Sequence, residues 1–323
     1  MVRMDTRKVQ ITGKSTYIVT LPKKWASKEK LKSGSPLSII YNDDGSLIIS
    51  PPCVEKGRDI RKIKANKNLE HLKRDIIGLY IVGDYKYIEV HGEHLSGEFR
   101  DEIKNLCNRL VGLELAESSD KLLVIQNYLD IDEFTIEKGI KRMSSIIYLM
   151  FEEMYDAFEN NDRSVCKDII KRDDDIDRLF ILVSKQFVSR LSLRKFSKND
   201  SLSLIEAFYY RLAGNDIERI GDHISKIVLH YEHTEIMPDV LSQLKELCMV
   251  LQDMFMDSLE SLRRSDNLLA NQVLERGEEI NGRLLIVAQS SENASINMII
   301  DSFGRIRDYA SNIAEYSIDL SQL

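Results

Sequence analysis

The sequence predicts a multidomain, mainly α-helical protein with a small β-rich domain at its N-terminus. Four of its five prolines fall within residues 1–52, and the fifth, Pro238, stands alone in the rest of the chain. Because proline interrupts helix interiors, the two parts of the chain follow different structural rules. At 323 residues, a single hydrophobic core would be near its upper size, so two or three domains are expected.

Charge divides the chain in the same way. Residues 1–66 carry 14 Lys and Arg against 6 Asp and Glu, whereas residues 67–323 carry 31 against 46. A basic N-terminal part favours an anionic partner, with nucleic acid as the first candidate. The acidic remainder argues against a protein that coats nucleic acid along its whole length.

Several protein classes are excluded by composition. No apolar run approaches the roughly 18 residues that span a bilayer, and the first residues lack the apolar stretch of a signal peptide. We therefore expect a cytoplasmic protein without membrane insertion. The four cysteines are far apart and form no CxxC pair, which supports neither a disulfide framework nor a zinc ribbon.

The first domain, residues 1–52, is predicted to contain two β-hairpins and a short helix. Alternating apolar residues indicate strands at residues 7–12, 16–21, 37–41 and 46–50. Gly13-Lys14 and Asp43-Asp44-Gly45 are the predicted turns, and Pro22 suits the start of the helix. A domain of this size buries too little apolar surface to be stable alone, so we expect a dimer or docking on the rest of the chain.

Residues 67–130 are predicted to form a small α/β domain. The pattern favours helices at residues 69–79 and 98–110, and strands at residues 80–82, 87–91, 113–115 and 122–126. Its glycines match neither GxGxxG nor a P-loop, so the sequence gives this domain no nucleotide site and no assigned role.

Residues 132–323 are predicted to be helical throughout and to contain an internal repeat. Six long segments are expected, at about 133–160, 163–195, 200–233, 239–264, 267–290 and 294–320. An offset of 104 residues aligns Arg172 with Arg276, and an offset of 86 aligns Asp222 with Asp308. The simplest interpretation is two three-helix units, about 132–235 and 238–323. The alternative is the general similarity of amphipathic helices.

Two acidic pairs have the spacing of one helical turn. Asp173 and Asp177 are four residues apart, as are Glu218 and Asp222, so each pair shares a helix face and can converge on a cation. Carboxylate oxygens suit magnesium, manganese, calcium or iron. In a chain this charged, a solvated acidic face remains the alternative.

The N-terminal segment resembles a known DNA-binding family. The string R-K-V-Q-I-T-G-K-S-T-Y-I-V-T-L-P-K-K-W, followed by S-G-S-P-L-S-I-I-Y-N-D-D-G-S-L-I-I, is similar to the AbrB/MazE/SpoVT domain over residues 3–51. The resemblance implies a swapped-hairpin β-barrel that forms a homodimer and binds DNA. The basic residues proposed to contact DNA are Arg3, Arg7, Lys8, Lys14, Lys23 and Lys24, with Arg7, Lys8 and Lys14 favoured for reaching base edges.

The helical part resembles the PhoU family of phosphate uptake regulators over about residues 132–323. Its E/DxxxD signature is matched at Asp173–Asp177 and at Glu218–Asp222, the latter within N-D-I-E-R-I-G-D-H. The resemblance implies a six-helix, two-lobed bundle whose carboxylates hold divalent or iron cations. The metal candidates are Asp173, Asp177, Glu218 and Asp222, with Asp174, Glu275, Glu279 and Asp308 as weaker ones. Gly304 and Asn281 replace two acids in the second repeat.

Together, these features favour a DNA-binding transcriptional regulator of phosphate uptake and phosphate homeostasis. Its helical body would sense metal, phosphate status or a transporter partner. One alternative is an interaction module that restrains a phosphate transporter or sensor kinase without binding DNA. A metal-dependent hydrolase is the other alternative, but the sequence offers no paired nucleophile and base, so no enzyme is expected.

Overall fold

The computed structural model describes residues 5–13, 15–41, 45–51, 60–65, 68–83, 85–129, 134–192, 202–289 and 293–323. The chain divides into two units, Met1–Gly57 and Arg58–Leu323, and each is described by itself. Arg3 and Lys14 lie outside the described residues, as do the turn residues Asp43 and Asp44.

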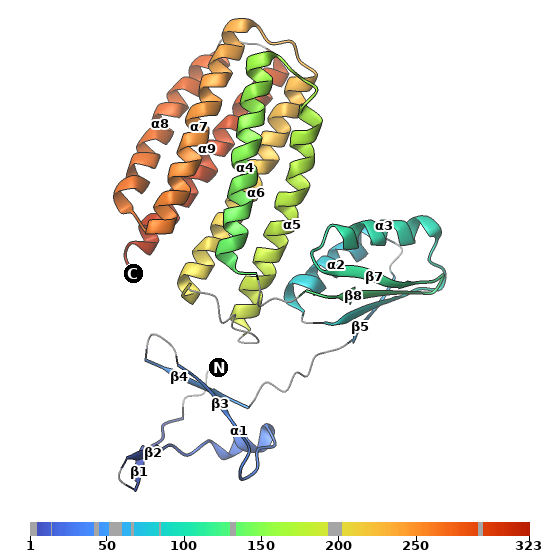
Figure 1. The fold of residues 1–323 in the computed structure, drawn as a ribbon, viewed down its shortest axis with the longest axis vertical. Helices are drawn as coiled ribbons and strands as arrows, with labels where there is room; N and C mark the ends of the chain where they lie inside the picture. The colour runs from blue at the N-terminus through green and yellow to red at the C-terminus, as the bar shows by residue number, and fades with distance from the viewer. Residues whose placement is uncertain are drawn as a thin grey trace. The chain divides into compact units, whose positions relative to one another are not determined.

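The N-terminal unit contains the two predicted hairpins and the short helix (Figure 1). Strand β1 (Gln10–Thr12) pairs antiparallel with β2 (Thr16–Ile18), and β3 (Ser38–Tyr41) pairs antiparallel with β4 (Leu47–Ser50). Helix α1 (Lys23–Lys28) follows Pro22, as expected. Gly13 and Gly45 have φ angles of 68° and 80°, a left-handed conformation that glycine adopts without steric cost.

The described part of this unit has no buried residue. The apolar side chains that alternate along its strands are exposed instead. Val9 is 60% exposed, Ile11 62%, Tyr17 72% and Tyr41 78%. A single chain therefore leaves the apolar faces of both hairpins uncovered.

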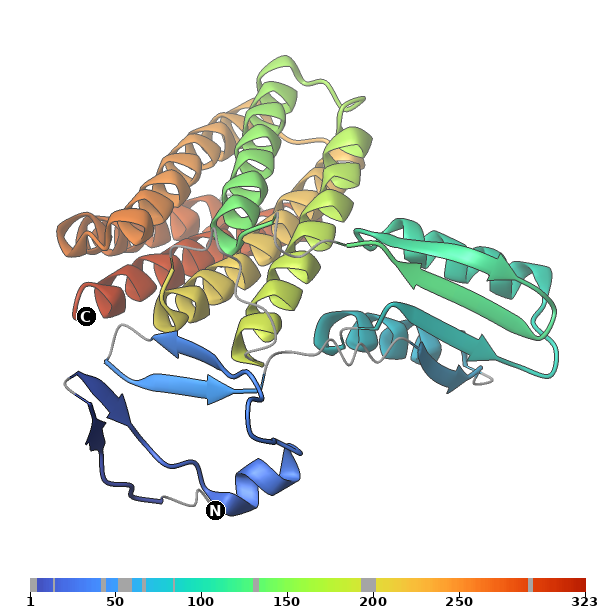
Figure 2. The ribbon, with the colours of Figure 1, turned by 60° about the horizontal axis from the view of Figure 1, so that its bottom comes forward.

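A four-stranded sheet with two helices follows at the start of the second unit (Figure 2). Its strand order is β5-β6-β8-β7, with β5 parallel to β6 and the other pairs antiparallel. The strands are β5 (Ile60–Lys64), β6 (Tyr87–His91), β7 (Leu113–Ser118) and β8 (Leu122–Asn127); the helices are α2 (Leu69–Val82) and α3 (Gly97–Asn108). Both helices pack on one face of the sheet, where Ile88, Val90, Leu123 and Ile125 are buried.

Two features of this α/β domain differ from the prediction. Residues 80–82, predicted as a strand, form the last turn of α2. Leu72, Ile76 and Tyr80 are all buried at four-residue spacing, so the helical period continues to the C-cap residue Gly83. The sheet also begins earlier than residue 67, because β5 pairs with β6. The sequence of β5, IRKIK, has too much charge to indicate a strand.

Within the described ranges from residue 134 onward, the structure contains the six predicted helices. They are α4 (Ile136–Asn160), α5 (Cys166–Leu191), α6 (Leu204–Glu232), α7 (Pro238–Arg264), α8 (Asn267–Gln289) and α9 (Ala294–Leu320). Local sequence explains several starts: Ser203 and Glu206 form a capping box at α6, and Pro238 occupies the first turn of α7. One continuous hydrophobic core joins all six helices. Within the described ranges, no helix is long and apolar enough to cross a membrane.

An ion pair and a helix end in α4–α6 have counterparts in α7–α9, each 104 residues later in the chain. Arg172 donates to Glu153 through Nε at 2.8 Å, and Arg276 donates to Asp257 through Nη1 at 2.7 Å. Asn161 and Ser265, which end α4 and α7, both have φ of 50°. The first of these ion pairs joins α4 to α5, and the second joins α7 to α8, so the two halves have equivalent contacts.

The α/β domain is attached to the bundle through Lys185. This lysine of α5 is only 2% exposed, and its Nζ donates to the Tyr80 and Gly83 carbonyls at 2.6 and 3.1 Å. These carbonyls lie at the C-terminal end of α2, where the helix dipole favours a positive charge. The Tyr80 ring centroid lies 4.6 Å from the same nitrogen.

Candidate functional site

Four predicted metal ligands lie together on α5 and α6. Asp173 and Asp177 come from α5, Glu218 and Asp222 come from α6, and all four are half-buried. The charge of Asp222 contributes to a raised pKa for the other three carboxyls, so the structure brings the two predicted pairs together. We call these four residues the acidic cluster.

Gly221 allows α6 to approach α5 closely at this cluster. A Cβ atom on Gly221 would lie 2.9 Å from Asp173 Oδ1 and 2.9 Å from Ile176 Cδ1, closer than ordinary van der Waals contact. The glycine between Ile220 and Asp222 therefore makes room for the Asp173 carboxylate.

Burial and mutual repulsion shift the acidic cluster toward the protonated state. Burial raises the pKa of Asp173 to about 7, and the charges of Asp222, Asp177 and Glu218 add to the effect. Burial, followed by the charge of Asp222, also raises the pKa of Glu218 to about 7. The pKa of Asp177 is raised for the same two reasons. A cation placed among these groups would stabilise their charged forms and so offset the effects of burial and repulsion.

The carboxylate oxygens of the acidic cluster are of the type that hard cations prefer as ligands. Asp173 Oδ1 and Glu218 Oε2 are buried without a hydrogen-bond partner, although Glu218 Oε2 lies 3.4 Å from Arg219 Nε in an ion pair. Carboxylate oxygens are ligands that magnesium, manganese, calcium and iron accept. In the part of the chain that the structure describes, however, no three His, Cys, Asp or Glu side chains are arranged as a ready metal site. The acidic cluster therefore fits a cation by its chemistry and charge, and metal binding stays a prediction.

Two arginines border the acidic cluster. Arg219 Nη1 lies 3.2 Å from Asp222, and Arg109, which ends α3 in the α/β domain, lies 2.9 Å from Asp174 and 3.6 Å from Asp177. Asp174, a weaker metal candidate, is thus exposed and already paired. Sequence reasoning missed Arg109, because nothing local connects α3 with a residue of α5 more than 60 positions later.

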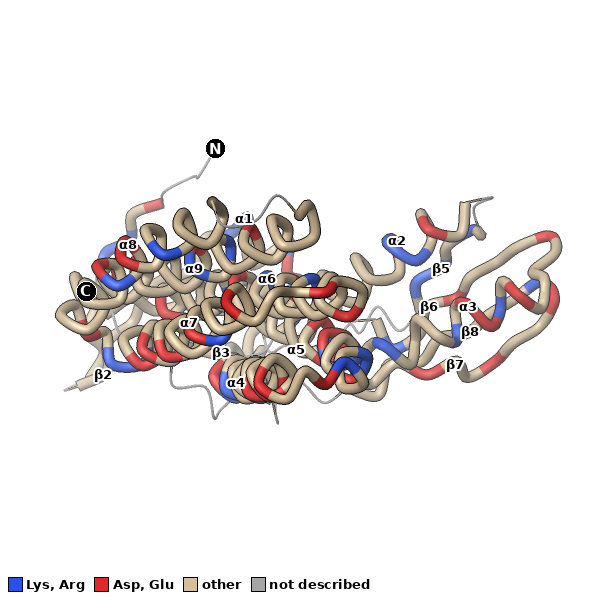
Figure 3. Tube along the Cα trace, turned by 90° about the horizontal axis from the view of Figure 1, so that it is seen from above, with Lys and Arg blue, Asp and Glu red and all other residues tan. Residues whose placement is uncertain are grey.

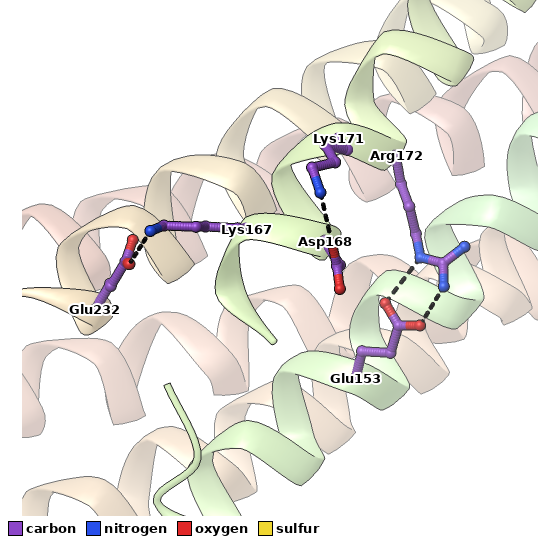
Figure 4. Close-up of polar contacts among 6 residues, drawn as sticks. All are labelled: Glu153, Lys167, Asp168, Lys171, Arg172 and Glu232. Atoms are coloured by element: carbon purple, nitrogen blue, oxygen red, sulfur yellow. Dashed lines mark hydrogen bonds and ion pairs between the residues drawn. The ribbon is translucent and has the colours of Figure 1, made fainter. Parts of the chain in front are cut away.

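Other charges of α5 have partners on neighbouring turns or helices (Figure 4). Arg172 contacts Glu153 of α4, Lys171 contacts Asp168 at 2.8 Å, and Lys167 lies 3.8 Å from Glu232 of α6. Both acidic and basic residues occur along the helices of the bundle (Figure 3). Asp173 Oδ1, which is buried and has no hydrogen-bond partner, contrasts with this pairing.

The weaker candidates in the second half are not gathered in the same way. Asp308 contacts Arg307 and lies 3.9 Å from Arg305, so two guanidinium groups already balance its charge. Glu275 and Glu279 are exposed on α8. Glu279 lines a shallow surface cavity of about 360 Å³ in which Arg276 also lies.

The described DNA-contact candidates of the N-terminal unit are all exposed. Arg7 and Lys8 precede β1, and Lys23 and Lys24 lie in the first turn of α1. Arg7 Nη2 lies 3.7 Å from Asp5 Oδ2 in an exposed ion pair. These side chains are available to an external anion.

Comparisons with known proteins find matches to two separate parts of the chain. Residues 10–59 match the family model described as antidote-toxin recognition MazE, bacterial antitoxin, and residues 140–229, which span most of α4–α6, match the PhoU domain. The phosphate-specific transport system accessory protein PhoU homolog of Aquifex aeolicus (strain VF5) is 26% identical over 152 residues. The match covers 46% of this chain and 66% of that protein, just under two thirds of its length.

Two solved structures are similar to the helical part. The crystal structure of PhoU from Pseudomonas aeruginosa has a TM-score of 0.48 and 20% identity, and the match covers 58% of this chain and 95% of that one. The phosphate transport system regulatory protein PhoU from Streptococcus pneumoniae gives the same TM-score and identity over 59% of this chain and 94% of that one.

Proposed function

Because the chain contains a PhoU domain and, at its N-terminus, a MazE-type domain, we propose that it is a DNA-binding transcriptional regulator of phosphate uptake and phosphate homeostasis. The presence of both domains in one chain is the observation that carries this proposal. One domain supplies an exposed basic surface, and the other supplies an acidic cluster suited to a cation.

In this proposal, a second copy of the chain covers the apolar faces of the N-terminal unit. None of the described residues of the unit is fully buried, and exposed side chains such as Tyr17 and Tyr41 would gain from a partner surface. A swapped-hairpin β-barrel homodimer would supply that surface. It would also double the number of basic residues that face DNA.

The acidic cluster is the proposed sensor of the helical body. Asp173, Asp177, Glu218 and Asp222 would hold a divalent or iron cation, which would neutralise their charge. A cation or a phosphate-transport partner alters DNA affinity only if it favours one arrangement of the two N-terminal units. No catalytic role is proposed, and turnover of phosphate esters in the presence of Mn²⁺ would contradict this assignment.

The first test measures retention of DNA fragments from the chain's own upstream region and from phosphate-transport promoters. The variant Arg7→Ala/Lys8→Ala/Lys14→Ala should lose specific retention while its sedimentation still shows a dimer. The control variant Lys104→Ala/Lys121→Ala/Lys141→Ala removes three exposed lysines outside the N-terminal unit and should bind as the unchanged protein does. Equal retention of promoter and random DNA by the unchanged protein would refute a specific regulator.

A second candidate function is an interaction module that restrains a phosphate transporter or a sensor kinase. The match to a protein named as a phosphate transport accessory favours it. In this case the basic N-terminal residues would be dispensable for regulation in cells, and only the dimer would matter. The triple alanine variant separates the two functions, because the regulator needs DNA binding and the interaction module does not.

A further inference from the structure

In each half of the helical bundle, a glycine on one helix faces a charged residue on a neighbouring helix, and the two residues occupy opposite helices in the two halves. In α4–α6, the glycine is Gly221 of α6 and the charged residue is Asp173 of α5, with 2.9 Å between a Cβ at position 221 and Asp173 Oδ1. The offsets of 104 and 86 residues relate Asp173 to Gly277 of α8, and Gly221 to Arg307 of α9. The glycine and the charged residue have therefore exchanged helices.

The second half has a looser version of this contact. A Cβ atom on Gly277 would lie 3.1 Å from Met254 Cε and 3.2 Å from Ser311 Oγ, and it would lie 3.8 Å from Arg307 Cγ, which is an ordinary contact distance. Arg307 is one-fifth exposed, and its Nε donates to Asp308 Oδ1 at 3.1 Å. Asp308 is the equivalent of Asp222. The guanidinium thus reaches the carboxylate whose counterpart belongs to the acidic cluster.

The other equivalent positions carry no negative charge. Asn281 replaces Asp177, and Gly304 replaces Glu218. Of the four carboxylates in the first half, only the equivalent of Asp222 remains in the second half, and it has two arginines close by. The second half therefore has no excess of negative charge at this place.

We propose that Arg307 takes the place, in α7–α9, of the cation that the acidic cluster holds in α4–α6. The inference rests on the proposed cation site and limits it to one acidic cluster per chain. A guanidinium is always charged and needs no free ion, so the second half is stable whatever the metal supply. Only the first half changes its charge with the cation concentration.

A binding experiment tests the consequence for stoichiometry. Calorimetric titration of the full chain with Mn²⁺ should show binding that Asp173→Asn/Asp222→Asn abolishes. The variant Gly277→Asp/Asn281→Asp/Gly304→Glu/Arg307→Gly gives the second half the residues of the first, and it should bind twice as many Mn²⁺ ions per chain. If the unchanged chain already binds Mn²⁺ in both halves, with Asp308 needed for the second, the inference is wrong.

A stability experiment tests the role of Arg307 without metal. The reciprocal variant Asp173→Gly/Ile176→Ala/Gly221→Arg places an arginine in the first half, and Ile176→Ala makes room for the new side chain, whose Cβ would otherwise lie 2.9 Å from Ile176 Cδ1. Its Tm in EDTA should exceed that of the control Asp173→Gly/Ile176→Ala by about 2–4 °C, since the control lacks only the guanidinium. Arg307→Met keeps the apolar stem of the side chain and should lower the Tm in EDTA.

The two experiments fail in distinguishable ways. If the unchanged chain binds no Mn²⁺, the proposed cation site is wrong, while the Tm values still decide whether a guanidinium stabilises this place. If Arg307→Met leaves the Tm unchanged and the reciprocal variant is no more stable than Asp173→Gly/Ile176→Ala, Arg307 is not a substitute for a cation, whether or not Mn²⁺ binds.

Discussion

Gly221 sets the distance between α5 and α6, because any side chain there would overlap Asp173 and Ile176. We predict that Gly221→Ala lowers the free energy of unfolding by about 1–3 kcal/mol through overpacking. The matched control is Gly282→Ala in α8, where a Cβ meets nothing within 4 Å, and a gain of up to about 1 kcal/mol is expected. Urea unfolding measures both. Equal effects of the two substitutions would contradict the close approach.

The raised pKa values of Asp173 and Glu218 predict a stability that depends on pH. Both are about 7 in the folded chain, against about 4 for an unfolded carboxyl, so the folded state binds more protons between these limits. Without a cation, stability therefore falls as pH rises from about 4 to 7 and stays low above that range.

Asp173→Asn should remove much of this dependence. In EDTA, we expect it to raise the free energy of unfolding at pH 8 by roughly 1–2 kcal/mol, a value reduced for the partial exposure of the site. It should have little effect near pH 4. Urea unfolding at both pH values is the measurement, with Asp156→Asn, an exposed carboxylate of α4, as the control. A gain of the same size at both pH values would show that ionisation of the Asp173 carboxyl is not the cause.

For individual residues, the sequence indicated the members of the acidic cluster but not the residues that surround it. The spacing of Asp173 and Asp177 places them on one face of a helix from local geometry alone. Arg109 contacts Asp177 from the α/β domain, and the periodicity of a helix cannot predict a contact with another domain. The opposite placement of Gly277 and Arg307 also needed the structure, because an alignment of two positions does not show that they touch.

Among the elements, helices and hairpins with strong local patterns were predicted correctly. The six long helices keep an apolar stripe for many turns, and the glycine turns of the N-terminal hairpins are local as well. The error at residues 80–82 arose because Tyr, Ile and Val also favour strands, while the buried positions Leu72, Ile76 and Tyr80 continue the helical period. β5 is stabilised by pairing with β6, a contact that its own five residues do not specify.

Helix α5 holds the α/β domain through Lys185, and this contact gives a prediction at the scale of elements. Lys185→Met would remove the donor for the Tyr80 and Gly83 carbonyls at the end of α2. We expect faster amide hydrogen exchange in α2, unchanged exchange in α7–α9, and a loss of about 1–3 kcal/mol in the free energy of unfolding.

The control for this substitution is Lys171→Met, which removes an exposed ion pair with Asp168 on the same helix. Its expected effect is below about 1 kcal/mol. If both variants exchange alike in α2, Lys185 does not anchor the domain.

For the whole molecule, the charge asymmetry of the sequence predicts a salt-dependent interaction with DNA. The logarithm of the affinity should fall linearly with the logarithm of salt concentration. Arg7→Ala/Lys8→Ala/Lys14→Ala should reduce the slope by about one for each phosphate that is no longer neutralised, so by about three for each N-terminal unit on DNA. Filter binding over a salt series measures the slope. An unchanged slope would mean that other residues neutralise the phosphates.

The sequence specified the hairpins of the N-terminal unit, but a single chain does not show how they are covered. The exposed Val9, Ile11 and Tyr17 point to an association that one copy cannot display. We predict that Tyr17→Asp/Val19→Asp weakens self-association in analytical ultracentrifugation, because it places charges on the uncovered apolar faces. Lys23→Asp/Lys24→Asp, on exposed positions of α1, should leave self-association unchanged.

Phe151 and Phe255 occupy equivalent positions in the two halves of the bundle, and their rings lie side by side with centroids 6.3 Å apart. The helices α6 and α9, also equivalent, pack along each other, and so do α4 and α7. A contact between a residue and its own counterpart is isologous, which is what a two-fold axis produces in a homodimer. Each half thus contacts the other through the same surface. In evolutionary terms, a three-helix ancestor that paired with itself would account for these contacts, and its fusion into one chain would free one copy to diverge.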